Sequence, residues 1–142
     1  KFHSQGSISE AIKYYQYFIN QGFKDHRVFS NYGVLLNDAG KLKEAELAYR
    51  KAIEIKPDYA EAHSNLGNTL NDLGKLEEAE LSYRKAIEIK PDYAEAHYLL
   101  SVIYSKEKLF SKAYKEINLA IKYDSKNHIY QGELNRLKFI ID

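Results

Sequence analysis

The chain has 142 residues, of which 44% are hydrophobic and 29% charged, values typical of a folded globular protein. Twenty-one Lys and Arg against twenty Asp and Glu leave a net charge of +1, which argues against nucleic acid and anionic membranes as partners. No apolar run approaches the roughly 20 residues of a membrane-spanning helix, and the absence of cysteine excludes disulfides and is compatible with a cytoplasmic location.

A segment of fifteen residues, YRKAIEIKPDYAEAH, occurs twice, at 49–63 and at 83–97. The offset of 34 extends beyond this segment, because 26–59 and 60–93 are identical at 24 of 34 positions. Such a period indicates a repeat protein whose units stack on one another. The chain is then divided into a partial unit, three full units and a closing segment, at 1–25, 26–59, 60–93, 94–127 and 128–142.

Each unit is predicted to fold as two helices joined by a tight turn. In 60–93 the helical apolar pattern is interrupted at Gly74, which can adopt the left-handed conformation that ends a helix. We expect a first helix that ends near Asp72 and a second helix over 76–89. Pro91 stops the second helix, because proline has no amide hydrogen.

Local signals refine the ends of these helices. Asp58 followed by Glu61 has the spacing of an N-cap signal, and Asp92 with Glu95 repeats it. We therefore expect both Asp side chains to accept hydrogen bonds from free amides of the first turn. The third unit departs from the pattern, since Lys108 stands where the other units have Gly.

The closing segment, 128–142, has apolar residues at helical spacing, interrupted by Gly132. We interpret it as a helix that covers the exposed end of the third unit, or as the first helix of a truncated fourth unit. The chain also opens in mid-pattern, as expected for a segment of a longer protein.

The unit resembles the tetratricopeptide repeat, a 34-residue helix-turn-helix. The small residues of that family are matched at three places of the unit, by Gly33, Gly67, Ala45, Ala79, Ala113, Ala52, Ala86 and Ala120. The resemblance implies an all-α fold, a right-handed superhelical solenoid of antiparallel helix hairpins. It also implies that the first helices line a concave groove in which ligand peptides lie.

The first helices have a polar side rich in Asn, Ser and Asp. Such residues are each roughly 0.5 kcal/mol worse than Ala as helix formers, whereas the outward side of the second helix uses good helix formers, with Glu80 and Arg84 spaced for an i,i+4 pair. Because an amide both donates and accepts, we predict that the polar side binds an extended peptide. The predicted binding residues are Arg27, Ser30, Asn31, Asn37, Asp38, Glu61, Ser64, Asn65, Asn68, Asn71, Asp72, Tyr98 and Val102.

Two alternatives to this interpretation remain open. The Asn-rich stripe can be a tolerated product of duplication with no role in binding. The second alternative concerns the third unit, where Tyr98 and Val102 predict a groove that becomes apolar toward the C-terminus. Ordinary packing within the protein explains Tyr98 equally well.

Narrower resemblances point in different directions. The phrase SN[LY]G around Asn31 and Asn65 looks like the repeats of O-linked N-acetylglucosamine transferase, whose groove asparagines hold peptide backbone. The carboxylate clamp of chaperone-binding members is matched only at Asn65, which argues against chaperone C-terminal tails as partners. The clamp positions are occupied here by Ser30, Val34, Asn65, Glu95 and Leu99.

No catalytic, metal-binding or nucleotide-binding pattern is present in the sequence. The five histidines lack metal-ligand spacing, and His63 and His97 fall on the apolar side of their helices, so we expect them in the core. Tyr49 and Tyr83, which hold equivalent places in two successive units, are expected there too. We predict no enzyme activity, no metal and no cofactor within this chain.

Three functions are consistent with these patterns. The first is a module that binds an extended peptide or protein segment along the first helices. The second is the substrate-targeting arm of a larger transferase whose catalytic domain lies outside this chain. The third is a self-associating scaffold, because similar units expose similar end surfaces that can stack between molecules.

Overall fold

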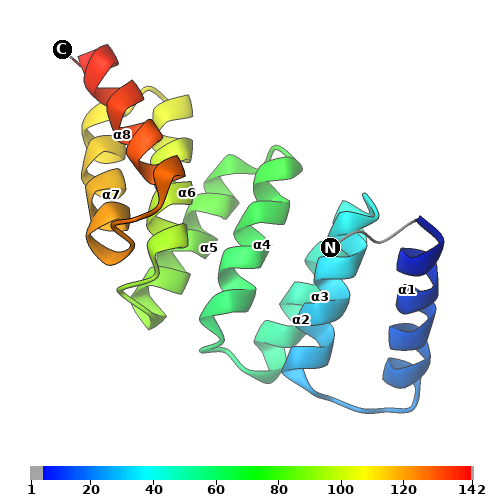
Figure 1. The fold of residues 1–142 in the computed structure, drawn as a ribbon. Helices are drawn as coiled ribbons and strands as arrows, with labels where there is room; N and C mark the ends of the chain where they lie inside the picture. Colours follow the sequence, from blue (N-terminus) through cyan, green and yellow to red (C-terminus); the bar gives the residue numbers. More distant parts are fainter. Residues whose placement is uncertain (1–4, 142) are drawn as a thin grey trace. The chain divides into compact units, whose positions relative to one another are not determined.

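The computed structural model describes residues 5–141, and this part of the chain contains helices and no strand. Short loops join the helices, as Figure 1 shows. The helices are α1 (Gln5–Asn20), α2 (His26–Asp38), α3 (Leu42–Ile55), α4 (Ala60–Asp72), α5 (Leu76–Ile89), α6 (Ala94–Lys106), α7 (Phe110–Tyr123) and α8 (His128–Ile141). The predicted all-α class and the predicted ends of α4 and α5 are confirmed.

The helices recur with the period of the sequence. The first helices of successive hairpins begin at equivalent places of the repeat, at His26, Ala60, Ala94 and His128. The chain divides into two compact units with the boundary between residues 79 and 80, inside α5. The first unit contains α1 to α4, the second contains α6 to α8, and we describe each by itself.

In the first unit, small residues allow α2 and α3 to approach closely. A Cβ atom added at Gly33 would lie 2.7 Å from the ring of Tyr49, which is 2% exposed. Ala45 and Ala52 on α3 are fully buried. Leu36 of α2 is also buried, and burying such a side chain contributes about 1.5–3 kcal/mol. The repeated Gly and Ala therefore set how closely the two helices pack.

In the second unit, α6, α7 and α8 share an apolar core. Ile103 of α6 and Ile117 of α7 are fully buried. Tyr130, Leu134 and Leu137 bury one side of α8, and Gly132 does not interrupt this helix. Residues 128–141 are thus helical, while residue 142 and residues 1–4 lie outside the described part.

The turns inside the hairpins require a left-handed residue. Gly40 and Gly74 have φ angles of 79° and 81°, as the sequence predicts for residues that follow a first helix. Lys108 holds the corresponding place in the third hairpin and has a φ of 62°. Because a residue with a Cβ atom is strained in this region, the third hairpin keeps the turn at some cost in stability.

The predicted caps at Asp58 and Asp92 are wrong. The N-cap residues of α4 and α6 are Tyr59 and Tyr93, neither of which makes a side-chain cap, and Asp58 instead forms an ion pair with Lys56 at 3.2 Å. Each Asp lies one residue before the N-cap, which places its carboxylate outside the first turn.

Polar residues at the true N-cap position do form caps. Asp25 Oδ1 accepts a hydrogen bond from the amide of Arg27 at 2.8 Å and caps α2. Asn127 Oδ1 accepts from the amide of Ile129 at 2.9 Å at the start of α8. The capping residue is therefore the one immediately before each first helix, and only some repeats have a capping side chain there.

Candidate functional site

The polar sides of α2 and α4 carry most of the predicted binding residues. We define the α2–α4 face as Asn31 and Asp38 on α2 with Glu61, Asn65 and Asp72 on α4. Their spacings of four and seven place each set on one side of its helix. Asn65 is half-buried and the other four are exposed. Within residues 5–141 the side chains of Asn31 and Asn65 have no hydrogen-bond partner, so both amides are available to a ligand.

Tyr59 joins the N-terminal ends of α2 and α4. Its hydroxyl donates to Oε1 of Glu61 at 3.0 Å, and its ring packs edge-on against His26 with 4.7 Å between the ring centroids. Burial, followed by the hydrogen bond to Glu61, raises the pKa of Tyr59. Sequence reasoning did not select this tyrosine, although its recurrence as Tyr93 in the next unit is a visible signal.

Arg27 is exposed at the same end of the face, but its charge is already paired. Its guanidinium donates to both carboxylate oxygens of Asp25, from Nη2 at 3.0 Å and from Nε at 3.2 Å. These side-chain hydrogen bonds, together with the backbone hydrogen bond from Arg27, lower the pKa of Asp25 to about 2. Arg27 therefore contributes little free positive charge to the face.

A hydrogen bond links the C-terminal halves of α2 and α4. Thr69 Oγ1 donates to Asn37 Oδ1 at 3.0 Å, so Asn37 uses its amide oxygen inside the protein. The counterpart of Thr69 in the next unit is Ile103, which has no hydroxyl. Asn71, the counterpart of Asn37, has a buried Oδ1 without a hydrogen-bond partner among the described residues. This link fixes the two helix ends next to Asp38.

Two predicted binding residues do not line an accessible groove. Ser30 and Ser64 are 2% and 0% exposed, so neither side chain lies at the surface. A helix that packs against several neighbours buries more than one narrow stripe, and small side chains next to that stripe become covered. The remaining predicted residues that are neither buried nor fully exposed are Asn37, Asn65, Asn68, Asn71, Tyr98 and Val102.

In the second unit Tyr98 lies in a mixed rather than an apolar setting. Its ring stacks on Tyr130 with 5.0 Å between centroids. Burial raises the pKa of Tyr98, with a further contribution from the nearby Glu133 carboxylate. Arg136 donates to Glu133 at 2.6 Å and to Ser105 at 2.6 Å. Tyr98 thus packs against Tyr130 within the second unit, and the ion pair between Arg136 and Glu133 borders it.

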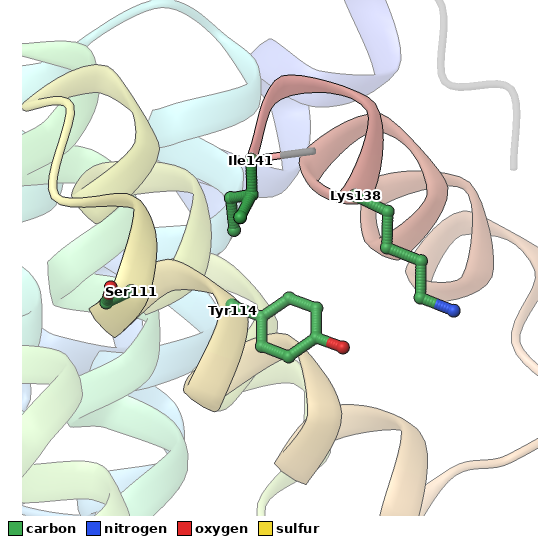
Figure 2. A pocket seen from close by; sticks show the side chains of 4 residues that line it. All are labelled: Ser111, Tyr114, Lys138 and Ile141. Carbon is green, nitrogen blue, oxygen red and sulfur yellow. The ribbon is translucent and has the colours of Figure 1, made fainter.

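A hollow of about 520 Å³ lies between α7 and α8, lined by Ser111, Tyr114, Lys138 and Ile141 (Figure 2). None of the predicted binding residues lines it. Within residues 5–141, no group of three or more His, Asp and Glu residues is placed to hold a metal ion. In the same range, no helix combines the length and apolar character needed to cross a bilayer.

These features define a class, namely helical repeat proteins built from successive helix hairpins. Family models confirm the class. A model described as TPR repeat matches residues 33–74 and 67–107, and one described as tetratricopeptide repeat matches residues 94–127. The chain belongs to the tetratricopeptide repeat family. A comparison with curated protein sequences gives no match.

Solved structures share this fold at low sequence identity. MamA from Desulfovibrio magneticus RS-1, residues 41 to the end, has a TM-score of 0.86 and 21% identity over 97% of this chain and 78% of its own. A crystal structure of MamA has a TM-score of 0.81 and 24% identity, covering 85% of this chain and 71% of its own. The first TPR of Spaghetti (RPAP3), bound to the HSP90 peptide SRMEEVD, has a TM-score of 0.79 and 19% identity, covering 82% and 93%.

Proposed function

We propose that this chain is a protein interaction module whose α2–α4 face binds an extended segment of another protein. The observation that carries the proposal is the pair of amides at Asn31 and Asn65, which hold the same place on successive first helices and have no hydrogen-bond partner between residues 5 and 141. An amide can donate to a peptide carbonyl and accept from a peptide N–H, so a row of amides suits an extended backbone.

Two further observations support this function. The Thr69 to Asn37 hydrogen bond and the Tyr59 ring link α2 to α4, so the face is held in place before a ligand arrives. Such preorganisation lowers the entropy cost of binding. In addition, the first TPR of Spaghetti (RPAP3), which shares the fold, is bound to an HSP90 peptide. This chain has different residues at most positions of the carboxylate clamp of chaperone-binding members, so we propose a partner other than a chaperone tail.

The test uses partners captured from a lysate and reduced to a short binding segment by peptide arrays. Asn31→Ala together with Asn65→Ala should weaken binding of that segment by about tenfold, because each lost hydrogen bond contributes about 0.5–1.5 kcal/mol. The melting temperature should not fall. Asn118→Ala is the matched control, since Asn118 is an exposed asparagine on the second helix α7. An unchanged affinity in the double variant would refute the proposal.

Self-association is a second candidate, favoured by exposed apolar side chains on the first and last helices. On α1, Tyr14 and Tyr17 are 64% and 66% exposed, and on α8 Phe139 is 88% exposed. Such residues can be covered by another copy. Light scattering over a wide concentration range tests this, because a constant monomer mass would exclude it.

The targeting arm of a larger transferase remains a hypothesis that rests on the resemblance around Asn31 and Asn65. The matching family models describe the repeat alone. The full reading frame of the gene tests this hypothesis, because a transferase domain in the same frame would support it.

A further inference from the structure

We infer that the segment bound on the α2–α4 face is basic, with Lys or Arg side chains opposite Asp38 and Asp72. This inference rests on the proposed function and adds the chemical class of the partner. It is carried by the distribution of charge within the first unit, by the placement of the two aspartates, and by their relation to the free amides of the same face.

Helices α2 and α4 supply the face with three carboxylates and no unpaired Lys or Arg of their own. The sequence of α4 contains neither Lys nor Arg, and α2 contains only Arg27, which Asp25 already neutralises. Within residues 5–141, Asp38, Glu61 and Asp72 form no ion pair. Because the whole chain has a net charge of +1, this negative charge belongs to the face and not to the protein in general.

The second helix of the same hairpin shows the opposite arrangement. The sequence of α3, LKEAELAYRKAIEI, contains three basic and three acidic residues. Arg50 pairs with Glu46 at 2.9 Å and with Glu78 at 3.2 Å, and Lys51 pairs with Glu54 at 3.2 Å. Charges on α3 are therefore balanced within the unit, whereas those on the α2–α4 face are left for a partner.

Asp38 and Asp72 occupy places that helix stability does not favour. Each is the last residue of its helix, where the macrodipole disfavours negative charge, and neither helix has a basic residue in its last turn. The corresponding residue of α6 is Lys106, the favourable choice. Aspartate thus ends α2 and α4, where it is unfavourable, whereas α6 ends with the favourable lysine. This difference indicates that the two aspartates have a role other than folding, and that the role is confined to the first unit.

The face is suited to an extended chain with alternating side chains. Asp38 follows Asn31 by seven places on α2, and Asp72 follows Asn65 by seven on α4, so amide and carboxylate repeat in the same order on both helices. In an extended peptide the backbone can pair with the amides while alternate side chains point toward the carboxylates. A basic segment satisfies both groups, and an acidic segment is repelled.

Three labelled peptides of equal length test the inference, with every second residue lysine, glutamate or glutamine. Fluorescence anisotropy with the intact chain should give the highest affinity for the lysine peptide, and this affinity should decrease as salt increases. Asp38→Asn with Asp72→Asn should weaken it by about fivefold, as expected for two exposed ion pairs. The variants are isosteric and relieve the charge at the helix ends, so they should not impair folding.

Glu44→Gln with Glu54→Gln on α3 removes the same charge from exposed positions outside the face and serves as the control. Equal affinity for the three peptides, preference for glutamate, or an equal loss in the α3 control would overturn the inference. The proposed function is tested separately, because it stands if Asn31→Ala with Asn65→Ala weakens the captured segment. If neither pair of variants affects binding, both the function and the inference fail.

Discussion

The contact between His97 and Glu116 makes the stability of the second unit depend on pH. His97 is 4% exposed, with Nε2 at 2.9 Å from the carbonyl oxygen of Pro91 and Nδ1 at 2.7 Å from Oε1 of Glu116. A carbonyl and a carboxylate both accept hydrogen bonds, so both ring nitrogens donate when the imidazole is charged. Burial opposes the charged form, but the hydrogen bonds to Glu116 and Pro91 outweigh it and raise the pKa of His97.

Other groups near this pair come from α5, α6 and α7. Arg84 of α5 and Tyr104 of α6 both interact electrostatically with the Glu116 carboxylate. The ring of Tyr123 on α7 lies 5.7 Å from the His97 ring. Glu116 is therefore shared between two cations, and loss of the His97 proton removes one of them.

The sign of the effect follows from the direction of the shift. Because the pKa of folded His97 exceeds the unfolded value of about 6.5, its stabilisation is complete below that pH and is lost as the pH rises through the folded pKa. A hydrogen bond to a charged group contributes about 1.5–3 kcal/mol. The free energy of unfolding should therefore fall, by at most about this amount, as the pH rises above about 6.5 and through the folded pKa of His97.

Urea denaturation followed by circular dichroism measures this slope, and Glu116→Gln should remove most of it while retaining a neutral hydrogen-bond partner. If Glu116→Gln keeps the wild-type slope, the assignment of the pH dependence to this pair is refuted.

Three further predictions concern glycine positions, a turn residue with positive φ, and helix capping. Gly33→Ala should cost about 1–3 kcal/mol of unfolding free energy, because its Cβ meets a buried ring, whereas Gly132→Ala, with open space around it, should stabilise α8 by about 0.5–1 kcal/mol. Lys108→Gly should raise the stability by about 1 kcal/mol in denaturation by relieving a positive φ. Asp25→Ala should lower the melting temperature because it removes a helix cap, while Asp58→Ala, which removes none, should leave it nearly unchanged.

Most of the helical architecture was predictable from the sequence, because it depends on local sequence signals that recur in successive repeats. Gly40 and Gly74 end the first helices through a left-handed residue, and Pro91 follows the end of α5. The burial of His63 and His97 also followed from helical period alone. Each of these features involves residues close together in the chain.

The exposure of the candidate-site residues was predictable only in part. The exposed positions of Asn31, Asp38 and Asp72 follow from the same period, and the structure leaves them at the surface. The period assigned Ser30 and Ser64 to the same side, yet both are buried, because a helical wheel does not show how wide an arc the neighbouring helices cover.

The amino-acid sequence by itself determined the hairpins, their period and their turns, since these depend on backbone preferences within a few residues. Only the tertiary structure decided which polar groups are satisfied inside the protein. Asn37 meets Thr69, and His97 meets Glu116, across separations of 32 and 19 residues. Such pairs form when different helices pack together, and no local preference specifies which side chain arrives opposite another.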